Sequence, residues 1–528
     1  MPNDHFNSFT LGSSYDNDGR AAKSKLQLTE AGLKERVAGF ITFDDVLQKE
    51  LGKLDGSSCT MISENSRPRR GVYVRIIDSE SNESFVARVI DGPFYTKQPG
   101  AFYLLQLDAM LIGNERTVIQ SRPSPGSPVS FLDPNLVQEY IGALGDFKLG
   151  RLVTEKKVQV ALDSSTLNRH IGVFGTTGSG KSNSLQVIVE EASGSDRAVL
   201  IFDIEGEYVR MNEPTDALKH ILKDFGKQPQ GVRDLQVYVP APNRSMNTEA
   251  KRFGIPFVDI DLEIFSEVLG LSPFERVYML DVARKAKDHS GSFQPYDMRA
   301  VLNVLKKRID AQVEKASLPE VVAEAHMGLY TKLSLVVKSG VVDAHNSGEV
   351  RERIAPEELC VPGRITVIDV NESSDIVRNL CIAHLLKEIF RYKSGRSETP
   401  PILIFMEEIH TFLSRAKKRT MTATLTMLTE MARQGRKRGI GLGFVSQQPA
   451  LVPSELIELC NTRFIHRISS EANIQVLRNS TGNVEDSLWT LLPSFGNGEV
   501  LIASPKFHHA VIAQIRPNMS RRLRVEYS

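Results

Sequence analysis

The feature that most constrains this chain is the run GTTGSGKS at residues 175–182. It fits the pattern G-x-x-x-x-G-K-[ST], whose glycines let a loop curl until its backbone N–H groups face phosphate oxygens. An apolar stretch, HIGVFG, precedes the run, and a helix-forming stretch, SNSLQVIVEEA, follows it. Strand, glycine-rich turn and helix in this order predict an α/β domain that binds a nucleoside triphosphate.

Each position of this loop has an expected task. Lys181 is expected to neutralise charge on the β- and γ-phosphates, and Ser182 to ligate Mg²⁺. ATP and Mg²⁺ are therefore the expected cofactors. The predicted nucleotide-binding residues are Gly175, Thr176, Thr177, Gly178, Ser179, Gly180, Lys181, Ser182 and Asn183.

Further apolar runs predict the rest of a parallel sheet. They are AVLIFDIEG, RITVIDV, PILIFMEE and GIGLGFVSQQ, with EVLIASP and AVIAQIRP as extensions near the C-terminus. Continuous apolar runs separated by helices are typical of parallel strands covered on both faces.

Two acids end the fourth of these runs. Glu407 is expected to hold Mg²⁺ through water, although Asp is commoner at this position, and Glu408 to orient or polarise the attacking water. The alternative is a strand that ends in solvated acids. The strand AVLIFDIEG lies between the phosphate loop and these acids in sequence, an order that resembles the RecA-like ring ATPases.

Polar residues elsewhere extend the predicted site. Gln447 follows a strand and is expected to contact the γ-phosphate or the attacking water. Arg433 and Arg436 follow a helical stretch and could reach a neighbouring subunit's γ-phosphate, which requires a ring; Arg169 is a weaker candidate. The alternatives are amides that cap a strand end and a solvated basic face.

The remaining segments suggest further domains. Residues 1–36 read as a flexible arm, 37–133 as a small antiparallel β-barrel, and 211–360 as a mostly helical insertion that interrupts a core of 150–210 and 361–515. A tail of 516–528 follows. The fold class is therefore α/β, with a RecA-like core.

Composition excludes several classes. Lys and Arg number 65 against 64 Asp and Glu, so net charge favours no nucleic-acid partner, and only a local patch could. The four cysteines form no CxxC pair, which argues against a disulfide framework or a zinc site and fits a reducing cytoplasm. No apolar run of membrane-spanning length occurs.

With these residues assembled, the chain resembles the HerA family of hexameric DNA-translocating ATPases, relatives of FtsK. The motifs that carry the resemblance are NRH before GTTGSGKSN, DIEGEY at 203–208, EEIH at 407–410, RQGRKRG at 433–439, and SQQP followed by CNT at 460–462. The resemblance implies a homohexamer that hydrolyses ATP and pulls double-stranded DNA through its channel, with a nuclease or sirtuin-type effector as partner. It also implies that Asp203, as a further metal ligand, and Glu207 belong to the active-site neighbourhood, and that the N-terminal domain is a HAS barrel.

The basic run RAKKR at 415–419 is the predicted DNA contact, since clustered cations meet phosphates without reading bases; a solvated loop is the alternative. Two other functions stay open at this point. One is a ring that nucleotide merely stabilises and that assembles an effector enzyme. The other is a nucleotide-dependent switch that acts as monomer or dimer.

Overall fold

The computed structural model describes residues 7–15, 21–28, 37–42, 57–64, 67–95, 100–112, 115–290, 296–315, 320–343, 350–351, 353–394, 396 and 398–523. The chain forms two compact units. The first comprises Met1–Leu162 with Lys506–Gln514, and the second comprises Asp163–Pro505 with Ile515–Ser528.

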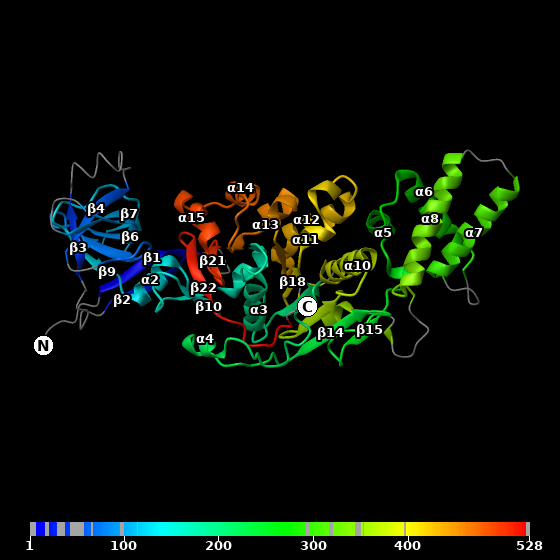
Figure 1. Cartoon of the computed structure of the whole chain (residues 1–528), viewed down its shortest axis with the longest axis horizontal. Helices are drawn as coiled ribbons and strands as arrows, with labels where there is room; N and C mark the ends of the chain where they lie inside the picture. Colours follow the sequence, from blue (N-terminus) through cyan, green and yellow to red (C-terminus); the bar gives the residue numbers. More distant parts are fainter. Residues whose placement is uncertain are drawn as a thin grey trace. The chain divides into compact units, whose positions relative to one another are not determined.

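A closed antiparallel barrel forms the centre of the first unit (blue in Figure 1). Its strands pair in the order β7–β4–β3–β9–β5–β6, and β6 pairs again with β7 to close it. Inward side chains such as Cys59, Met61, Val74 and Ile76 are fully buried. The strands are β3 Val37–Thr42, β4 Ser58–Ser63, β5 Tyr73–Ile77, β6 Ser84–Phe94, β7 Ala101–Ile112 and β9 Pro128–Phe131. The predicted barrel is therefore confirmed.

Smaller elements complete this unit. They are β1 Asn7–Tyr15, β2 Ala21–Leu28, β8 Glu115–Thr117, α2 Pro134–Ile141, β10 Phe147–Leu152, β11 Gln159–Leu162 and β22 Val511–Ile515. The arm predicted for residues 1–36 thus contains two strands, and its other residues lie outside the described part of the chain.

A largely parallel sheet forms the centre of the second unit. Within this unit its order is β21–β20–β12–β19–β18–β13–β17–β14–β15–β16, and β20 pairs antiparallel with β21. The strands are β12 Ile171–Phe174, β13 Ala198–Asp203, β14 Leu235–Pro240, β15 Lys251–Phe253, β16 Val350–Arg351, β17 Ile365–Asp369, β18 Ile402–Met406, β19 Ile440–Ser446, β20 Thr462–Ile465 and β21 Glu499–Ala503. β12 lies between β19 and β20, so the residues after these three strands meet at one edge.

Helices cover both faces of this sheet. The connection from β12 to β13 runs in one direction along the sheet, and those through α10, α12 and α13 run in the other. Because such crossovers are right-handed, α3 covers one face and these three helices cover the opposite face, where they contact one another (Figure 1). The bounds are α3 Lys181–Ala192, α9 Pro356–Leu359, α10 Asp375–Ser394, α11 Ile409–Phe412, α12 Thr422–Arg438, α13 Ser454–Leu459, α14 Glu471–Ser480 and α15 Asp486–Leu491.

The segment predicted as a helical insertion, 211–360, is mixed. Its helices are α4 Lys219–Asp224, α5 Leu262–Val268, α6 Pro273–Asp288, α7 Met298–Lys315 and α8 Glu320–Ser339. The segment also supplies β14, β15 and β16, which extend the parallel sheet beyond β17. The short strand LQVYVP is too brief to separate from its surroundings by periodicity alone, which is why sequence analysis did not find it.

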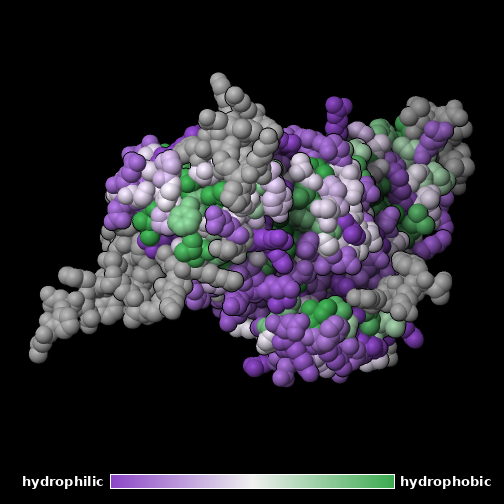
Figure 2. Space-filling model, turned by 60° about the vertical axis from the view of Figure 1, so that its left-hand side comes forward, coloured by the Kyte–Doolittle hydropathy of each residue, from purple (hydrophilic) through white to green (hydrophobic). Residues whose placement is uncertain are grey.

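Hydrophilic colour predominates on the face shown in Figure 2, and hydrophobic colour occurs there in small separate areas. In the described part of the chain, no helix combines the length and the apolar character needed to cross a bilayer.

Candidate nucleotide site

The phosphate loop connects β12 to α3. Gly175, Gly178 and Gly180 have φ values of 156°, 72° and 113°, the last two in the left-handed region that side chains disfavour. A Cβ on Gly175 would lie 2.6 Å from the Cβ of His466, and one on Gly180 would lie 3.1 Å from the backbone nitrogen of Gly498. The loop is therefore both curled and tightly enclosed, as phosphate binding by backbone N–H groups requires.

Lys181 is the buried cation of this loop. Its ammonium donates to the carbonyl oxygen of Thr176 at 3.1 Å, so it lies back across the loop. Burial lowers the pKa of Lys181, while the carboxylates of Glu408, Glu407 and Glu207 oppose that shift. These carboxylates keep the buried ammonium protonated, and a protonated ammonium can bind a phosphate anion in place of its present carbonyl partner.

Gln447 lies at the loop, as its position after β19 predicts. The Thr177 hydroxyl donates to its side-chain oxygen at 2.5 Å. Beneath it, the backbone N–H of Gly175 donates to the carbonyl oxygen of Ser446 at 3.4 Å. An amide bonded to the phosphate loop is well placed to exchange that bond for one to a phosphate or to water.

Glu408 follows β18 in a left-handed conformation, with φ 41°. Such a backbone is costly for a non-glycine residue and is common at functional sites. Its carboxylate accepts from the Gln447 backbone N–H at 3.3 Å and lies 3.2 Å from Nδ1 of His410. His410 in turn lies 3.2 Å from the Ser446 hydroxyl. Glu408 and Gln447 are therefore held together at the carboxyl ends of β18 and β19.

Asp203 organises the loop after β13. Its Oδ1 accepts from the N–H groups of Gly206 and Glu207, at 2.8 and 3.1 Å, and its Oδ2 accepts from that of Tyr208 at 2.9 Å. Burial raises the pKa of Asp203 to about 7, although the N–H groups of Tyr208 and Glu207 lower it. Both carboxylate oxygens accept from backbone donors, so Asp203 holds this loop in position. The metal-ligand role that the resemblance implies stays a prediction, since Oδ2 accepts only one of these bonds and keeps a further acceptor position.

Glu407 lies buried beside this loop. The Tyr208 hydroxyl donates to its Oε1 at 2.8 Å, and its Oε2 has no hydrogen-bond partner among the described residues. Burial, followed by the charges of Asp203 and Glu207, raises the pKa of Glu407 well above its usual range. A buried carboxylate oxygen without a partner is the kind of group that a cation completes.

Mg²⁺ fits this set of donors. It prefers oxygen ligands and usually takes one or two from protein, with phosphates and water supplying the rest. The free Oε2 of Glu407 and the half-buried hydroxyl of Ser182 are such oxygens. No cluster of three or more His, Cys, Asp or Glu suited to a metal occurs in the described part of the chain, so nucleotide phosphates would have to complete the shell.

Sequence reasoning missed His466, which lies under the phosphate loop. Its Nδ1–H donates to the carbonyl oxygen of Glu499 at 3.1 Å, and its Nε2 lies 2.9 Å from the Ser184 hydroxyl. Burial, followed by the nearby Lys181 ammonium, lowers the pKa of His466 to about 3, so the ring is neutral. Its position directly after β20, beside β12, was the available signal, but no motif marks it.

Two other residues predicted for the site, Asn183 and Arg169, make their contacts away from the phosphate loop. Asn183, expected to bind nucleotide, instead contacts the C-terminal segment: it donates to the carbonyl oxygen of Arg516 at 2.8 Å and accepts from the N–H of Asn518 at 3.0 Å. Arg169 is half-buried before β12, and its carbonyl oxygen accepts from the N–H of Asn461. β12 separates Arg169 from the phosphate loop.

Arg433 and Arg436 lie on the exposed face of α12, away from their own phosphate loop. His170, just before β12, donates to the carbonyl oxygen of Ala432 at 2.7 Å, so this half of α12 lies where β12 begins. The phosphate loop lies where β12 ends, about 10 Å away along a strand at ~3.3 Å per residue. Neither arginine forms an ion pair within the described residues.

The basic run 415–419 is partly anchored to the core. The Arg415 guanidinium donates to the carbonyl oxygen of Val452, Lys417 donates to that of Thr411, and Lys418 pairs with Glu455. Arg419 is exposed. The ion pair of Lys418 offsets one positive charge of the run, whereas the bonds of Arg415 and Lys417 to carbonyl oxygens leave their charges in place.

Comparisons with known proteins bear on the family and the fold. Residues 147–389 match the family described as "Helicase HerA, central domain". The chain is 24% identical over 392 residues to a DNA double-strand break repair helicase HerA of Saccharolobus solfataricus, and the aligned region covers 72% of this chain and 70% of the relative. It is 23% identical over 393 residues to a probable helicase of Methanocaldococcus jannaschii, covering 72% of this chain and 69% of the relative.

A solved structure of the plasmid coupling protein TrwB with a non-hydrolysable ATP analogue is similar in fold, with a TM-score of 0.50 and 11% identity over 74% of this chain and 94% of TrwB. This likeness confirms the P-loop core predicted from the sequence. Residues 147–389 are thus similar to the central domain of HerA helicases, in agreement with the motifs that carry the resemblance in the sequence.

Proposed function

We propose that this protein is an ATP-driven translocase that acts on double-stranded DNA as a ring, most simply a homohexamer. The observation that carries the proposal is the meeting of Lys181, Glu408 and Gln447 around one glycine-rich loop. Relatives whose names describe DNA repair helicases support DNA as the substrate.

In the proposed reaction, the loop N–H groups and Lys181 hold the β- and γ-phosphates. Glu408 orients water toward the γ-phosphorus, and Gln447, released from Thr177, contacts the γ-phosphate or that water. Ser182 and Glu407 supply the protein oxygens for Mg²⁺, which would offset phosphate charge.

The position of Arg433 and Arg436 supports a ring. They are exposed at the opposite end of β12 from their own phosphate loop, so any nucleotide that they contact would belong to an adjacent subunit. Such an arginine stabilises transition-state charge from outside the subunit that binds ATP. We further propose that a nuclease or sirtuin-type effector works with this ring, in DNA end processing or antiphage defence.

The decisive assay is the ATPase rate with linear duplex DNA, single-stranded DNA and no DNA, each at two salt concentrations. We expect strong stimulation by duplex that fades as salt rises, because phosphate contacts release counterions. A rate indifferent to all DNA would contradict translocation.

Two variants separate binding from hydrolysis. Lys181→Ala should abolish hydrolysis, and Glu408→Gln should bind ATP but turn over very slowly, because it keeps the shape but loses the charge that orients water. If effector activity survives in Glu408→Gln, the ring is instead a platform that nucleotide stabilises.

A further inference from the structure

The last described residues, 515–523, lie along the helix that begins at the phosphate loop, and we call them the C-terminal strap (red in Figure 1). Sequence analysis described residues 516–528 only as a tail. The strap instead contacts a stripe of polar side chains on α3, formed by Asn183, Gln186 and Glu190. Their spacing of three and four residues places them on one face of the helix.

The strap is attached to α3 at both ends of that stripe. At the first turn, Asn183 holds the backbone of Arg516 and Asn518. At the last turn, the Arg516 guanidinium donates to Glu190 at 2.6 Å and to Glu191 at 2.8 Å. The side chains of Arg516 and Glu190 are each only 2% exposed. Buried charges persist only when paired, so these contacts fix the strap on the helix.

Ser520 is the central contact. It is fully buried, and its hydroxyl donates to Oε1 of Glu190 at 2.6 Å and accepts from the Gln186 amide at 2.7 Å. The backbone N–H groups of Met519 and Ser520 donate to the same Glu190 oxygen, at 2.8 and 2.7 Å.

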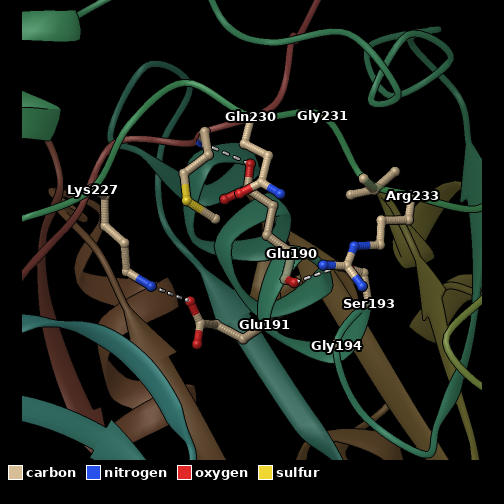
Figure 3. A pocket seen from close by; sticks show the side chains of 10 residues that line it. Glu190, Glu191, Ser193, Gly194, Lys227, Gln230, Gly231 and Arg233 are labelled. Carbon is tan, nitrogen blue, oxygen red and sulfur yellow. Dashed lines mark hydrogen bonds and ion pairs between the residues drawn. The ribbon is translucent and has the colours of Figure 1, made fainter.

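A cavity of about 380 Å³ beside this contact is lined by Glu190, Glu191, Lys227 and Gln230 (Figure 3). Lys227 crosses it to pair with Glu191 at 3.5 Å. On this side, polar contacts rather than close packing support the end of α3.

The strap also holds the loop after β13. The Arg521 N–H donates to the carbonyl oxygen of Glu213 at 2.8 Å, and the Leu523 N–H donates to that of Glu207 at 2.9 Å. From there, Tyr208 reaches Glu407 through its hydroxyl. The strap is thus joined at one side to the helix that carries Lys181, and at the other to the loop that supports Glu407.

We propose that the C-terminal strap positions the ATP site, with Ser520 and Arg516 as positioning residues that hold α3 and the 203–213 loop in register. This inference rests on the proposed ATPase. The phosphate loop has its own supports, since Thr176 bonds to the Arg467 carbonyl and His466 packs beneath it. A loosened strap therefore moves Glu407 and Glu207 more than it weakens phosphate binding, and it acts on kcat rather than on KM.

The test compares Ser520→Ala with Ser127→Ala in the full-length protein. Ser127 is a matched control because it too is fully buried and its hydroxyl donates to a carboxylate, that of Asp78 in the barrel unit. We expect kcat for MgATP to fall about 10- to 100-fold in Ser520→Ala, since small misplacements of reacting groups cost that much, with KM changed less than about threefold. Amide exchange should quicken across 203–213. Arg516→Lys should lose less activity than Arg516→Met.

An unchanged kcat together with unchanged exchange at 203–213 would overturn the inference, as would an equal loss of kcat in Ser127→Ala, which would reduce the effect to general stability. A wild-type protein that hydrolyses no ATP would refute the proposed function instead. In that case the exchange rates at 203–213 decide the positioning role alone: faster exchange in Ser520→Ala supports it and unchanged exchange overturns it.

Discussion

The hydrogen bond from Tyr208 to Glu407 offers a quantitative test of the metal site. Tyr208→Phe removes the hydroxyl that donates to Oε1 of Glu407 and leaves the buried ring in place. A hydrogen bond to a charged group contributes about 1.5–3 kcal/mol, and one pKa unit corresponds to about 1.4 kcal/mol. Because the hydroxyl stabilises the ionised carboxylate, its loss should raise the already raised pKa of Glu407 further.

If ATP hydrolysis requires ionised Glu407 to hold Mg²⁺, hydrolysis by Tyr208→Phe should require a higher pH. We expect the acid limb of the pH–kcat profile to move up by about 1–2 units, and the Mg²⁺ concentration for half-maximal rate at pH 7 to rise by about 10-fold or more. The assay is MgATP hydrolysis from pH 6 to 9 over a Mg²⁺ titration. Tyr238→Phe is the control, because Tyr238 is also buried and donates to a carboxylate, that of Glu358, away from the phosphate loop. If Tyr208→Phe keeps the wild-type profile, Glu407 is not the metal ligand.

The remaining predictions concern stability and the loop. His466 has a folded pKa of about 3 against an ordinary 6.5, so its neutral form stabilises the fold above pH 6.5, and that stability, at most about 5 kcal/mol, is lost as pH falls toward 3. The free energy of unfolding measured in urea should therefore fall less between pH 7 and pH 5 in His466→Asn than in wild type. Equal decreases would show that His466 is not a source of this pH dependence. Gly180→Ala should lose nucleotide affinity at a cost of about 1–3 kcal/mol, because its φ is 113° and its Cβ would approach Gly498. Gly194→Ala, whose Cβ would meet only an oxygen at 3.9 Å, should bind normally; equal binding by both variants would contradict the enclosed loop.

Sequence alone predicted those parts of the site that follow directly from strand ends. The run at 175–182 and the acids after β18 are local patterns, and parallel pairing brings their ends to one edge. Gln447 was predicted from the same rule, and it lies at the loop because β19 is adjacent to β12.

Contacts between distant segments could not be predicted in this way. Nothing local to Asn183 indicates that its partners are residues 516–518, more than 300 positions later. The occupied oxygens of Asp203 depend on how the following loop curls, which composition does not specify. Likewise, the neutral state of His466 comes from burial between α3 and the start of β21. Long-range polar networks of this kind are set by tertiary packing rather than by local propensity.

The most direct test of a shared site mixes two inactive proteins. Lys181→Ala lacks a working phosphate loop but keeps its arginines, and the double variant Arg433→Ala/Arg436→Ala keeps the loop but lacks the arginines. If an arginine completes the site of an adjacent subunit, mixing the two variants in equal amounts with duplex DNA should restore ATP hydrolysis. Some subunit interfaces then combine an intact phosphate loop from one subunit with intact arginines from the next. No recovery after verified co-assembly, or full activity of the arginine variant alone, would contradict a nucleotide site shared between subunits.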